Sequence, residues 1–557
     1  MLSGRVVKWK GLAMNNEISA AQHHNLIKDG LNRPEIPSFG QSERAGDASI
    51  RQNGKIKTLE ELAALLPLQR AQGKKIVHCH GVFDLLHIGH IRYLEQARGM
   101  GDVLVVTVTP DCYVDKGPHR PAFTETLRAE AVASLNCVDL VAINRWPTAE
   151  ETLRLLRPDV YVKGSEFKDT TSDMTGKIAL EEKVIREIGA TLAFAEDIVF
   201  SSTQLINRYL SSLPMEINKY LDLFRKRYTV AEILEILDRM SSLDVLVIGD
   251  TILDEYQYCE AIGKSSKDPV LALKYQSCDL FAGGVLAVAN HVANFANKVQ
   301  LMTVLGDRDS YADFILSQLH PNVSPYFAIK KNAPTLIKRR FIEGYSLNKL
   351  FEIYVMDDSG LSEEKDRQVC EWLRDHLPKY DVVIAADYGH GAVSKGMVQT
   401  LCEDARFLAV NTQANAGNRG FHTLSRYPRA NYVVLAEHEI RLLTRDLRGD
   451  VRLLVEPLAK DIGASRFVVT QGRMGCTVRG IRGEYVEVPS FAQNIVDRVG
   501  AGDAFFAVTS LAAVQNVPDE VLGFLGNIMG ALAVEMVGNK KPVDKLNAKK
   551  YIISLLK

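Results

Sequence analysis

Residues 74–100 constrain the fold of this 557-residue chain more than any other stretch. Residues 74–79 read KKIVHC, which is typical of a short buried strand, and apolar residues recur at helical spacing from Ile91 onward. Between the two lies HGVFDLLHIGH, at residues 80–90. Strand, glycine-containing turn and helix in this order predict a βα unit that places His87 and His90 on one face of the first helical turn.

The turn between this strand and helix is suited to bind phosphate. The first helical turn carries unpaired backbone N–H groups and the positive end of the helix dipole. His87 and His90 could donate hydrogen bonds to a triphosphate as negative charge builds on it. Two surface histidines on an ordinary helix are the alternative, which the combined strand, turn and HxGH pattern disfavours. The other residues of the turn that we assign to nucleotide binding are Gly81, Val82, Phe83 and Asp84.

Helix and strand patterns alternate across residues 57–210. A capping box (TLEE) opens the first helix, and four further apolar runs follow the first strand. Alternation of this kind predicts a parallel sheet covered by helices on both faces, and so an α/β fold. The four further strands are expected at residues 103–108, 138–143, 160–163 and 191–194.

Further polar residues of the N-terminal half lie where a phosphate-transfer site would need them. Fixed cations follow the second strand, with solvated surface as the alternative for any one of them. A lysine and a glycine end the fourth strand, where ligands collect in open α/β sheets. Hydroxyls open the last helix and could cap it or bind a phosphate. These residues are Lys116, Arg128, Lys163, Gly164, Ser201, Ser202 and Thr203.

The C-terminal half carries a second set of motifs for a polyol acceptor. Residues 243–250 (LDVLVIGD) predict a buried strand that ends in an acid, with a second acid four residues later. A glycine pair opens an alanine-rich helix, and residues 386–391 (ADYGHG) close another strand. The amide-rich stretch at residues 411–420 is either a polyol-binding loop or a turn cluster. The residues assigned to the acceptor are Asp250, Asp254, Gly283, Gly284, Asp387, Asn415 and Asn418.

Residues 497–505 read DRVGAGDAF and open a long apolar helix. Gly500 and Gly502 flank Ala501 and let the backbone N–H groups of this turn point toward a transferring phosphate, which predicts an anion hole. Asp503, at the mouth of the helix, could accept the proton of an attacking hydroxyl. A glycine-rich turn alone is usually structural, but this motif before a long helix points to phosphoryl transfer.

HGVFDLLHIGH resembles the signature of cytidylyltransferase-type nucleotidyltransferases. Residues 57–210 are similar to the nucleotidyltransferase domain of the bifunctional heptose-phosphate kinase/adenylyltransferases of lipopolysaccharide precursor synthesis. The resemblance implies a Rossmann-like domain in which His87, His90, Lys116, Arg128 and Ser201–Thr203 contact ATP or CTP, with Mg²⁺ bridging the phosphates. Literal HIGH also occurs in class I aminoacyl-tRNA synthetases. We disfavour that alternative, because KSSK at residues 264–267 lacks their methionine and runs into a strand.

Residues 243–557 resemble the ribokinase (PfkB) sugar kinases, through GAGDAF and through GDTILDEY and DYGHG of the heptose-phosphate kinase branch. The resemblance implies a ribokinase-like α/β domain with Asp503 as the base, Thr470 and Gly472 at the nucleotide, and Glu437 at Mg²⁺. It also implies a homodimer formed through the kinase domain. We expect four parts: a flexible extension (1–56), the nucleotidyltransferase domain (57–210), a helical linker (211–242) and the kinase domain (243–557).

The chain departs from this resemblance in its order and in its residues. The kinase leads in that family, whereas here the transferase leads. Ala287, Val434 and Val499 replace an asparagine, a second asparagine and a threonine of the family patterns. The leading hypothesis is a bifunctional enzyme that phosphorylates a sugar phosphate and then nucleotidylates it. The alternative is a transferase whose kinase-like half is catalytically silent and serves ligand binding or dimerisation.

Composition limits the partners. The net charge of −1 gives no bulk attraction to nucleic acid or anionic membrane, and no apolar run is long enough to span a bilayer. Eight cysteines without a CxxC pair predict buried thiols in a reducing compartment. We therefore expect a cytoplasmic enzyme with small-molecule substrates and neither nucleic-acid nor membrane partners.

Deleting residues 1–54 should leave both activities and the melting temperature unchanged. The segment is polar and lacks the apolar period needed to bury surface against either domain. Thermal unfolding and both activity assays on the truncated chain check this. A large fall in melting temperature would show that the segment packs against the rest of the protein.

Overall fold

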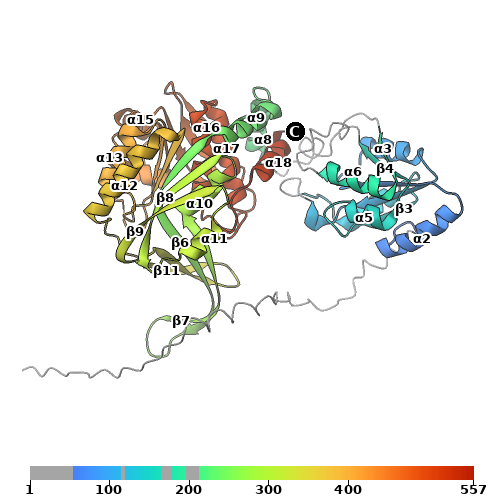
Figure 1. Cartoon of the computed structure of the whole chain (residues 1–557), viewed down its shortest axis with the longest axis horizontal. Helices are drawn as coiled ribbons and strands as arrows, with labels where there is room; N and C mark the ends of the chain where they lie inside the picture. Colours follow the sequence, from blue (N-terminus) through green and yellow to red (C-terminus); the bar gives the residue numbers. More distant parts are fainter. Residues whose placement is uncertain (1–53, 115–119, 165–176, 196–212, 419, 557) are drawn as a thin grey trace, which may run out of the picture.

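A computed structural model of the full chain describes residues 54–114, 120–164, 177–195, 213–418 and 420–556 (Figure 1). The N-terminal domain is a five-stranded sheet in the order β3-β2-β1-β4-β5, and every neighbouring pair is parallel. All five strands lie where the sequence predicted them. Their bounds are β1 Ile76–Gly81, β2 Val103–Val108, β3 Leu140–Ile143, β4 Val160–Gly164 and β5 Thr191–Ala195.

Helices cover both faces of this sheet because alternate residues of each strand point to opposite sides. Val77 and Cys79 of β1 pack with α3 (Ile88–Arg98) and α4 (Glu125–Ala133) in one core. Ile76 packs with α2 (Leu59–Ala71) on the other face. The remaining helices of the domain that the structure describes are α5 (Glu150–Leu156) and α6 (Lys177–Ile188). The predicted doubly covered parallel sheet is confirmed.

The expected boundary at residue 56 moves slightly. Ile56 forms a parallel bridge with Val141, and Lys57 N–H donates a 2.9 Å hydrogen bond to the Val141 carbonyl. Residues 54–56 therefore belong to the edge of the folded domain. Residues 1–53, the rest of the expected extension, lie outside the described residues.

The main sheet of the C-terminal domain has the order β9-β8-β6-β12-β13-β14-β15-β16-β17. Strands β9 to β15 are parallel, and β16 and β17 close the edge antiparallel. The bounds are β6 Asp244–Lys264, β8 Lys298–Arg308, β9 Val323–Pro334, β12 Val382–Asp387, β13 Leu408–Thr412, β14 Tyr432–Ala436, β15 Arg466–Thr470, β16 Cys476–Arg479 and β17 Tyr485–Val488.

Strand β6 is longer than predicted. It does not end at Asp250: beyond this residue it leaves the main sheet, enters a second, smaller one and continues there as far as Lys264. There it pairs with β7 (Leu271–Gly284) and with β10 (Ile337–Glu343), which pairs in turn with β11 (Lys349–Val355). Figure 1 shows these long strands projecting from the body of the domain, and we call the second sheet the lid.

Two helical layers cover the main sheet. One layer contains α12 (Glu363–His376), α13 (Lys395–Asp404), α14 (Glu437–Thr444) and α15 (Val451–Asp461). The other contains α10 (Val285–Ala293), α16 (Ala501–Val514), α17 (Asp519–Ala533) and α18 (Lys545–Leu556). The sheet lies between the two sets in Figure 1. This three-layer arrangement confirms the predicted α/β class.

The segment expected to be a linker belongs to the second layer. Residues 215–239 are helical as predicted, in α8 (Met215–Arg225) and α9 (Val230–Arg239). However, Leu221, Phe224, Ile233 and Leu237 are fully buried in the same core as α16 and α17. Amphipathic helices of this kind are stabilised by packing, so the C-terminal domain begins before residue 242.

All eight cysteines are free, as predicted, but three of them are not buried. Cys112 and Cys278 are exposed and Cys137 is half-buried. In the part of the chain that the structure describes, no helix has the length and hydrophobicity to cross a membrane.

Candidate active sites

The two histidines of HxGH lie together at the start of α3. His87 is the N-cap residue, and its Nδ1 accepts a 3.1 Å hydrogen bond from the Gly89 N–H. The rings of His87 and His90 stack with their centres 4.0 Å apart. The predicted shared face is therefore confirmed, at the carboxyl end of β1, where open α/β sheets bind ligands.

The turn before α3 is held in an uncommon conformation. Phe83 has a φ of 49°, which a bulky residue adopts only when its surroundings enforce it. Its ring lies edge-on to His90, with the ring centres 5.5 Å apart. A Cβ on Gly81 would lie 3.1 Å from the Phe83 ring, so this glycine makes room for the turn. Gly81, Val82 and Phe83 thus shape the turn that presents the histidines.

Asp84 has a structural role in this turn. Its carboxylate is 3% exposed and accepts hydrogen bonds from the Ala122 N–H at 2.6 Å and from Arg120 Nη1 at 3.0 Å. It ties the turn to the segment that follows the second strand. We predicted a direct nucleotide contact, but both of its oxygens are engaged within the protein.

Arg128 was also predicted to bind the triphosphate, and the structure places it elsewhere. Its side chain is fully buried. The guanidinium donates to the carbonyls of Val82, Thr109 and Phe123 and to the carboxylate of Asp111. It therefore joins the loops after β1 and β2 rather than facing a ligand. A buried arginine keeps its charge and therefore requires partners of this kind.

Lys163 and Gly164 lie at the end of β4, as expected. Lys163 Nζ forms a 2.7 Å ion pair with Glu181 of α6, and both side chains are largely buried. Gly164 pairs with Ala195 in the sheet. Four further predicted residues, Lys116, Ser201, Ser202 and Thr203, lie outside the described residues.

The sequence prediction did not include a hydrogen-bonded chain beneath the turn. The Thr107 hydroxyl lies 2.8 Å from His78 Nε2 and 2.9 Å from His80 Nδ1. His78 is fully buried, and burial, with the charge of Lys163 adding to it, lowers its pKa to about 3. His78 is therefore neutral, and it supports His80 from the interior of the sheet.

In the C-terminal domain, Asp503 occupies the third position of α16. Its Oδ1 accepts a 2.7 Å hydrogen bond from the Tyr388 hydroxyl. Burial raises the pKa of Asp503 to about 6, and the charge of Asp254 adds to the rise. The Tyr388 hydrogen bond and the charge of Lys338 oppose it. A carboxylate with a pKa close to neutral is suited to take a proton from a hydroxyl.

The lid supplies a row of charged residues on the same side as Asp503. Asp254 of β6 is 3% exposed and forms an ion pair with Arg340 of β10. A Cβ on Gly283 of the neighbouring strand β7 would overlap the Asp254 carboxylate, which explains why this position is glycine. Gly284, with a φ of 57°, is the N-cap of α10, as predicted.

Lys338 is a site residue that the sequence did not reveal. It lies opposite Asp254 in the pairing of β10 with β6, and it is 4% exposed. Its Nζ lies 5.1 Å from the centre of the Tyr354 ring, and it forms no ion pair within the described part of the chain. Burial lowers its pKa, and the charge of Asp254 opposes this. A lysine in the strand IKRRFIE shows no motif that would single it out.

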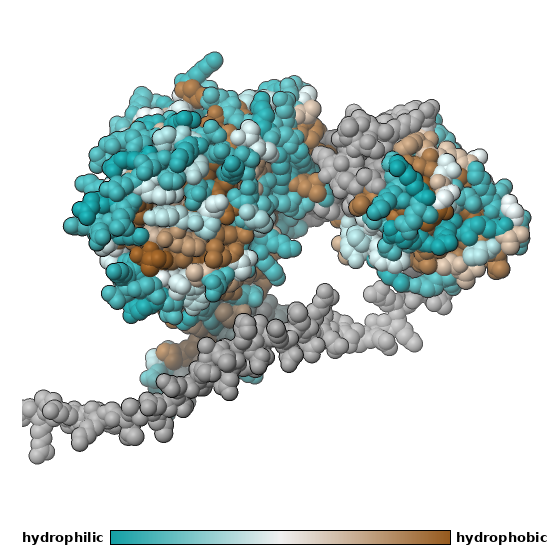
Figure 2. All heavy atoms as spheres, viewed as in Figure 1, coloured by the Kyte–Doolittle hydropathy of each residue, from teal (hydrophilic) through white to brown (hydrophobic). Residues whose placement is uncertain are grey.

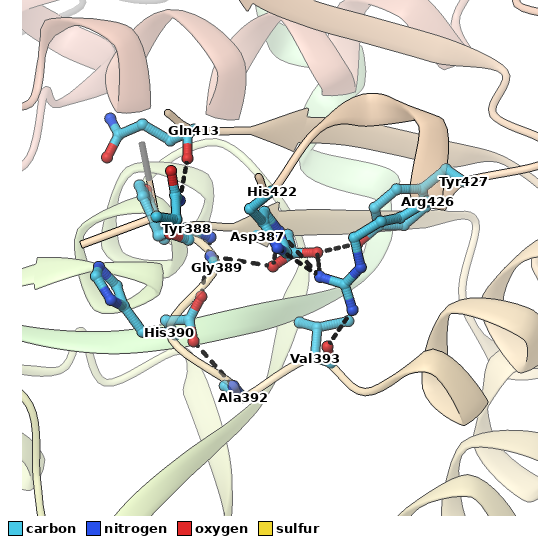
Figure 3. Close-up of polar contacts among 12 residues, drawn as sticks. Asp387, Tyr388, Gly389, His390, Ala392, Val393, Gln413, His422, Arg426 and Tyr427 are labelled. Atoms are coloured by element: carbon cyan, nitrogen blue, oxygen red, sulfur yellow. Dashed lines mark hydrogen bonds and ion pairs between the residues drawn. The ribbon is translucent and has the colours of Figure 1, made fainter. Parts of the chain in front are cut away.

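The carboxylates of Asp250 and Asp387 hold a loop rather than a ligand, and Figure 3 shows the contacts of Asp387. Asp250 accepts hydrogen bonds of 2.8 and 2.9 Å from the N–H groups of Tyr388 and Ala392. Asp387 is enclosed by His422 at 2.7 Å, Tyr427 at 2.9 Å and Arg426 at 3.0 Å. Burial and the charge of Asp387 raise the pKa of Asp250 to about 6. Both were predicted to hold the polyol; the structure shows them fixing the segment that carries Tyr388.

The amide-rich loop is a turn cluster, one of the two alternatives left open by the sequence. Asn415 Nδ2 donates to the Tyr388 carbonyl at 2.7 Å, and Asn418 Nδ2 donates to the Gln413 carbonyl at 2.8 Å. Their side-chain oxygens accept backbone N–H groups of the same loop. Asn415 and Asn418 are therefore used to pack the loop against Tyr388.

The GAGD turn borders a large cavity. Gly500 is the N-cap of α16 with a φ of 85°, a conformation that favours glycine. A cavity of about 730 Å³ opens beside it. Thr470, Gly472, Ala501 and Gly502 line this cavity, as expected for residues assigned to a nucleotide. Arg473 and Arg498, which the sequence did not single out, line it as well.

Glu437 is not placed as a metal ligand would be. It is half-buried on α14, where Arg441 Nη2 donates to it at 2.5 Å and Gln471 at 3.0 Å. Glu439, two residues later, is 8% exposed and accepts N–H groups of Ala414 and Ala436. Burial raises the pKa of Glu439 to about 7, and the charge of Asp503 adds to the rise. Glu439, rather than Glu437, is therefore the acid of α14 whose pKa is raised by the charge of Asp503.

With this geometry established, comparison with known proteins places both domains. A profile of the pfkB family of carbohydrate kinases matches residues 242–546, which is more than half of the chain. The chain belongs to this family. A cytidylyltransferase-like profile matches residues 78–208, so this family member carries a transferase-type domain before its kinase domain.

Curated relatives match the N-terminal domain. Bifunctional protein HldE of Citrifermentans bemidjiense is 41% identical over 124 residues, covering 22% of this chain and 26% of that protein. Bifunctional protein HldE of Geobacter metallireducens is 41% identical over 148 residues, covering 26% of this chain and 29% of that protein. The chain thus spans less than a third of the length of these relatives.

Solved structures are similar to the other half. Phosphofructokinase-2 from Escherichia coli, in a tetrameric inhibited form, has a TM-score of 0.46 at 16% identity and covers 57% of this chain and 100% of its own. Arabidopsis thaliana ribokinase, complexed with ribose and ATP, has a TM-score of 0.42 at 16% identity, covering 57% and 99%.

Proposed function

We propose that the protein is a bifunctional enzyme that makes an activated nucleotide sugar. The kinase domain would transfer the γ-phosphoryl group of ATP to a hydroxyl of a sugar phosphate. The N-terminal domain would then join a nucleoside monophosphate from ATP or CTP to the new phosphate and release pyrophosphate. The observation that carries this proposal is that one chain holds both an Asp503–Tyr388 pair at the GAGD turn and a stacked HxGH pair at a helix start.

In the kinase step, Asp503 would take the proton of the acceptor hydroxyl as its oxygen attacks the γ-phosphorus. The bond between the γ-phosphorus and the ADP oxygen breaks, and the N–H groups of the GAGD turn receive the developing negative charge. Asp254 and Lys338 lie on the lid side of Asp503, where their charges can orient the acceptor. Tyr388 fixes the rotamer of Asp503 through its 2.7 Å hydrogen bond.

The described residues fit Mg²⁺ only together with phosphates. No group of three or more acidic, histidine or cysteine residues among them could hold a metal ion alone. Mg²⁺ in kinases is usually bound by one or two carboxylates and the phosphates of the substrate. Glu439 is the acid that would supply this contact, because each of its oxygens accepts one backbone N–H group and keeps a second lone pair for the ion. Asp503 would stay available to take the proton. The ion would neutralise phosphate charge during transfer.

Glu439→Gln should lower the kinase kcat by about tenfold or more and raise the Mg²⁺ concentration needed for half-maximal rate, on the scale of a lost charge beside the phosphates. Glu437→Gln, two residues away, is the matched control, because Glu437 is already paired with Arg441, and it should change either value less than about twofold. Initial rates over a series of Mg²⁺ concentrations measure both. A larger effect of Glu437→Gln than of Glu439→Gln would assign the metal contact to Glu437 instead.

In the transferase step, the acceptor phosphate attacks the α-phosphorus of the nucleoside triphosphate. The bond to the pyrophosphate oxygen breaks, and the charge on the phosphates rises. His90, stacked on His87 at the N-terminus of α3, would donate to these oxygens together with the helix N–H groups. Its contribution is to stabilise the leaving pyrophosphate.

A silent kinase-like domain is the second candidate. Ala287 is buried on α10 and offers no hydrogen bond to a sugar hydroxyl. Asn415 and Asn418 are used to hold their own loop and to bind the Tyr388 carbonyl. The acceptor site thus has fewer free polar groups than the resemblance implies. The intact Asp503–Tyr388 pair favours an active kinase, because a silent domain has no catalytic need for it.

Mass spectrometry of reaction products tests the proposal directly. Purified protein would be offered a panel of free sugars and sugar phosphates with ATP, and then with CTP added. A sugar bisphosphate, followed by a nucleoside diphosphate sugar that keeps the original phosphate, is the expected result with a sugar phosphate. Transferase products from supplied sugar 1-phosphates, with no ADP from any sugar, would support the silent domain instead.

Self-association through the lid is part of the proposal. Ile262, Val270, Leu271 and Tyr275 at the end of the lid are all more than half exposed, and Figure 2 shows hydrophobic residues gathered there. A second copy of the chain would cover them, which fits the expected homodimer. Sedimentation velocity of the wild type and Leu271→Asp would test this: a monomer in both would contradict it.

A further inference from the structure

Helix α8 lies in a part of the chain that neither family profile covers. The transferase-type match ends at residue 208, and the pfkB match begins at residue 242. Even so, α8 is packed into the kinase core. Phe224 is fully buried and stacks on Phe524 of α17, with the ring centres 4.3 Å apart.

Polar contacts fix the same helix at its C-terminal end. Arg225 Nη2 donates a 2.6 Å hydrogen bond to the Leu555 carbonyl of α18. Arg227 forms a 2.7 Å ion pair with Glu520 of α17, whose side chain is 7% exposed. Aromatic stacking and these contacts hold α8 at a defined place against α17 and α18.

The other end of α8 reaches the cavity beside the GAGD turn. Pro214, its N-cap, and Ile217, in its first turn, line the cavity of about 730 Å³ together with Gly472 and Gly502. Phe505, Ala531 and Val534 add further apolar lining. Polar groups from Gln493 and Asn527, and the two cations Arg473 and Arg498, complete it.

This lining matches the chemistry of a nucleoside triphosphate. Apolar side chains with a few amides suit a flat base, and the arginines and the GAGD amides suit the phosphates. We propose that α8 is a built-in wall of this nucleotide site, with Pro214 and Ile217 packing against the base or ribose. The inference rests on the proposed function in taking the cavity as the ATP site of the kinase domain.

The proposal has a consequence for the whole chain. The residues that precede Pro214 connect it to the transferase-type domain, so the wall of the kinase nucleotide site is continuous with the segment that joins the two domains. A nucleotide in the cavity would contact α8, which continues from that segment. A kinase domain cut at residue 242, where the family match begins, would lack this wall.

Hydrogen exchange of the full chain, followed by mass spectrometry during an ATP titration, tests this and separates the two nucleotide sites by peptide. In the wild type, ATP should protect peptides from residues 213–225 and from residues 471–505 at the same concentrations. For each set of peptides, the half-point is the ATP concentration that gives half-maximal protection. Ile217→Ala should raise both half-points by about tenfold, the effect of removing one aliphatic contact with the nucleotide, and Ile217→Asp should raise them by more.

The matched control is Met215→Asp, because Met215 lies two residues away on α8, is 69% exposed and does not line the cavity. It should leave both half-points unchanged. Protection of residues 471–505 without any at residues 213–225, or unchanged half-points in both Ile217 variants, would overturn the proposal. No protection of residues 471–505 in the wild type would instead remove the proposed kinase nucleotide site itself.

Discussion

Asp503→Asn should lower the kinase kcat by about a thousandfold, the middle of the range for a lost general base. Asparagine keeps the shape of the side chain and can keep the Tyr388 contact, but it cannot take a proton from the acceptor hydroxyl. ATP should still bind, because the cavity lining and the GAGD turn are unchanged. ADP release across a panel of sugar phosphates, with ATP binding measured in parallel, checks both parts.

The pH dependence of the same step identifies the group. The pKa of Asp503 is raised to about 6, mainly by burial, and the base works only when ionised. The kinase kcat/KM should therefore be low at pH 5, rise through about pH 6 and level off above it. Tyr388→Phe removes the hydrogen bond that holds this pKa down, so the rising limb should move to higher pH.

Two results would contradict this role of Asp503. Turnover by Asp503→Asn close to the wild-type rate would exclude it as the base. A rising limb that stays at the same pH in Tyr388→Phe would assign the titration to another acid. Asp250, whose pKa is also raised to about 6, would be the first to examine. If the wild type binds ATP but releases no ADP with any sugar, the domain is silent.

The order of helices and strands was predicted well, because apolar periodicity and the residues that end a helix or strand are local features of the sequence. All five N-terminal strands were found from apolar runs of four to six residues between helical patterns. The capping box at Thr58 and Glu61 is present in the structure. The long strand β6 was cut short at Asp250, since an acid after an apolar run looks like a strand end. Its continuation depends on pairing with β7 and β10, which are distant in sequence.

Site residues were harder to assign, because position in the sequence does not show what a charged group contacts. Arg128, Asp250 and Asp387 do lie at loops near the sites, as predicted. Each is buried and pairs with backbone or side-chain groups from segments 17 or more residues away. Buried charges require such partners, so the acids and bases nearest a site are often those that build it.

The residues that were missed carry no local signature. Lys338 is one of three consecutive basic residues of β10, and only strand pairing shows that it faces Asp254. Glu439 lies two residues after the predicted Glu437, and the helical turn of α14 alone decides which of them is buried. Helix α8 was recognised as helical, but its burial against α17 depends on residues some 300 positions away.

His90→Ala should lower the rate of pyrophosphate release by about a hundredfold or more, the usual cost of losing one donor to a charged transition state. His90 does not cap the helix, so α3 and the kinase activity should be preserved. Replacing His87 affects two interactions at once, because His87 both stacks on His90 and caps α3 through its Nδ1.

The informative comparison is therefore His87→Asn with His87→Ala. Asparagine is among the best N-cap residues and restores the acceptor for the Gly89 N–H, whereas alanine removes it at a cost of about 1 kcal/mol. If the imidazole acts in catalysis, both variants should lose transferase rate to a similar extent, and only the alanine variant should also lose stability. Pyrophosphate release and thermal unfolding, with kinase activity as the internal control, give these quantities. A His87→Asn enzyme with wild-type rate would restrict His87 to the cap and leave His90 alone as the donor. An unchanged rate in His90→Ala as well would remove the HxGH pair from the transfer step.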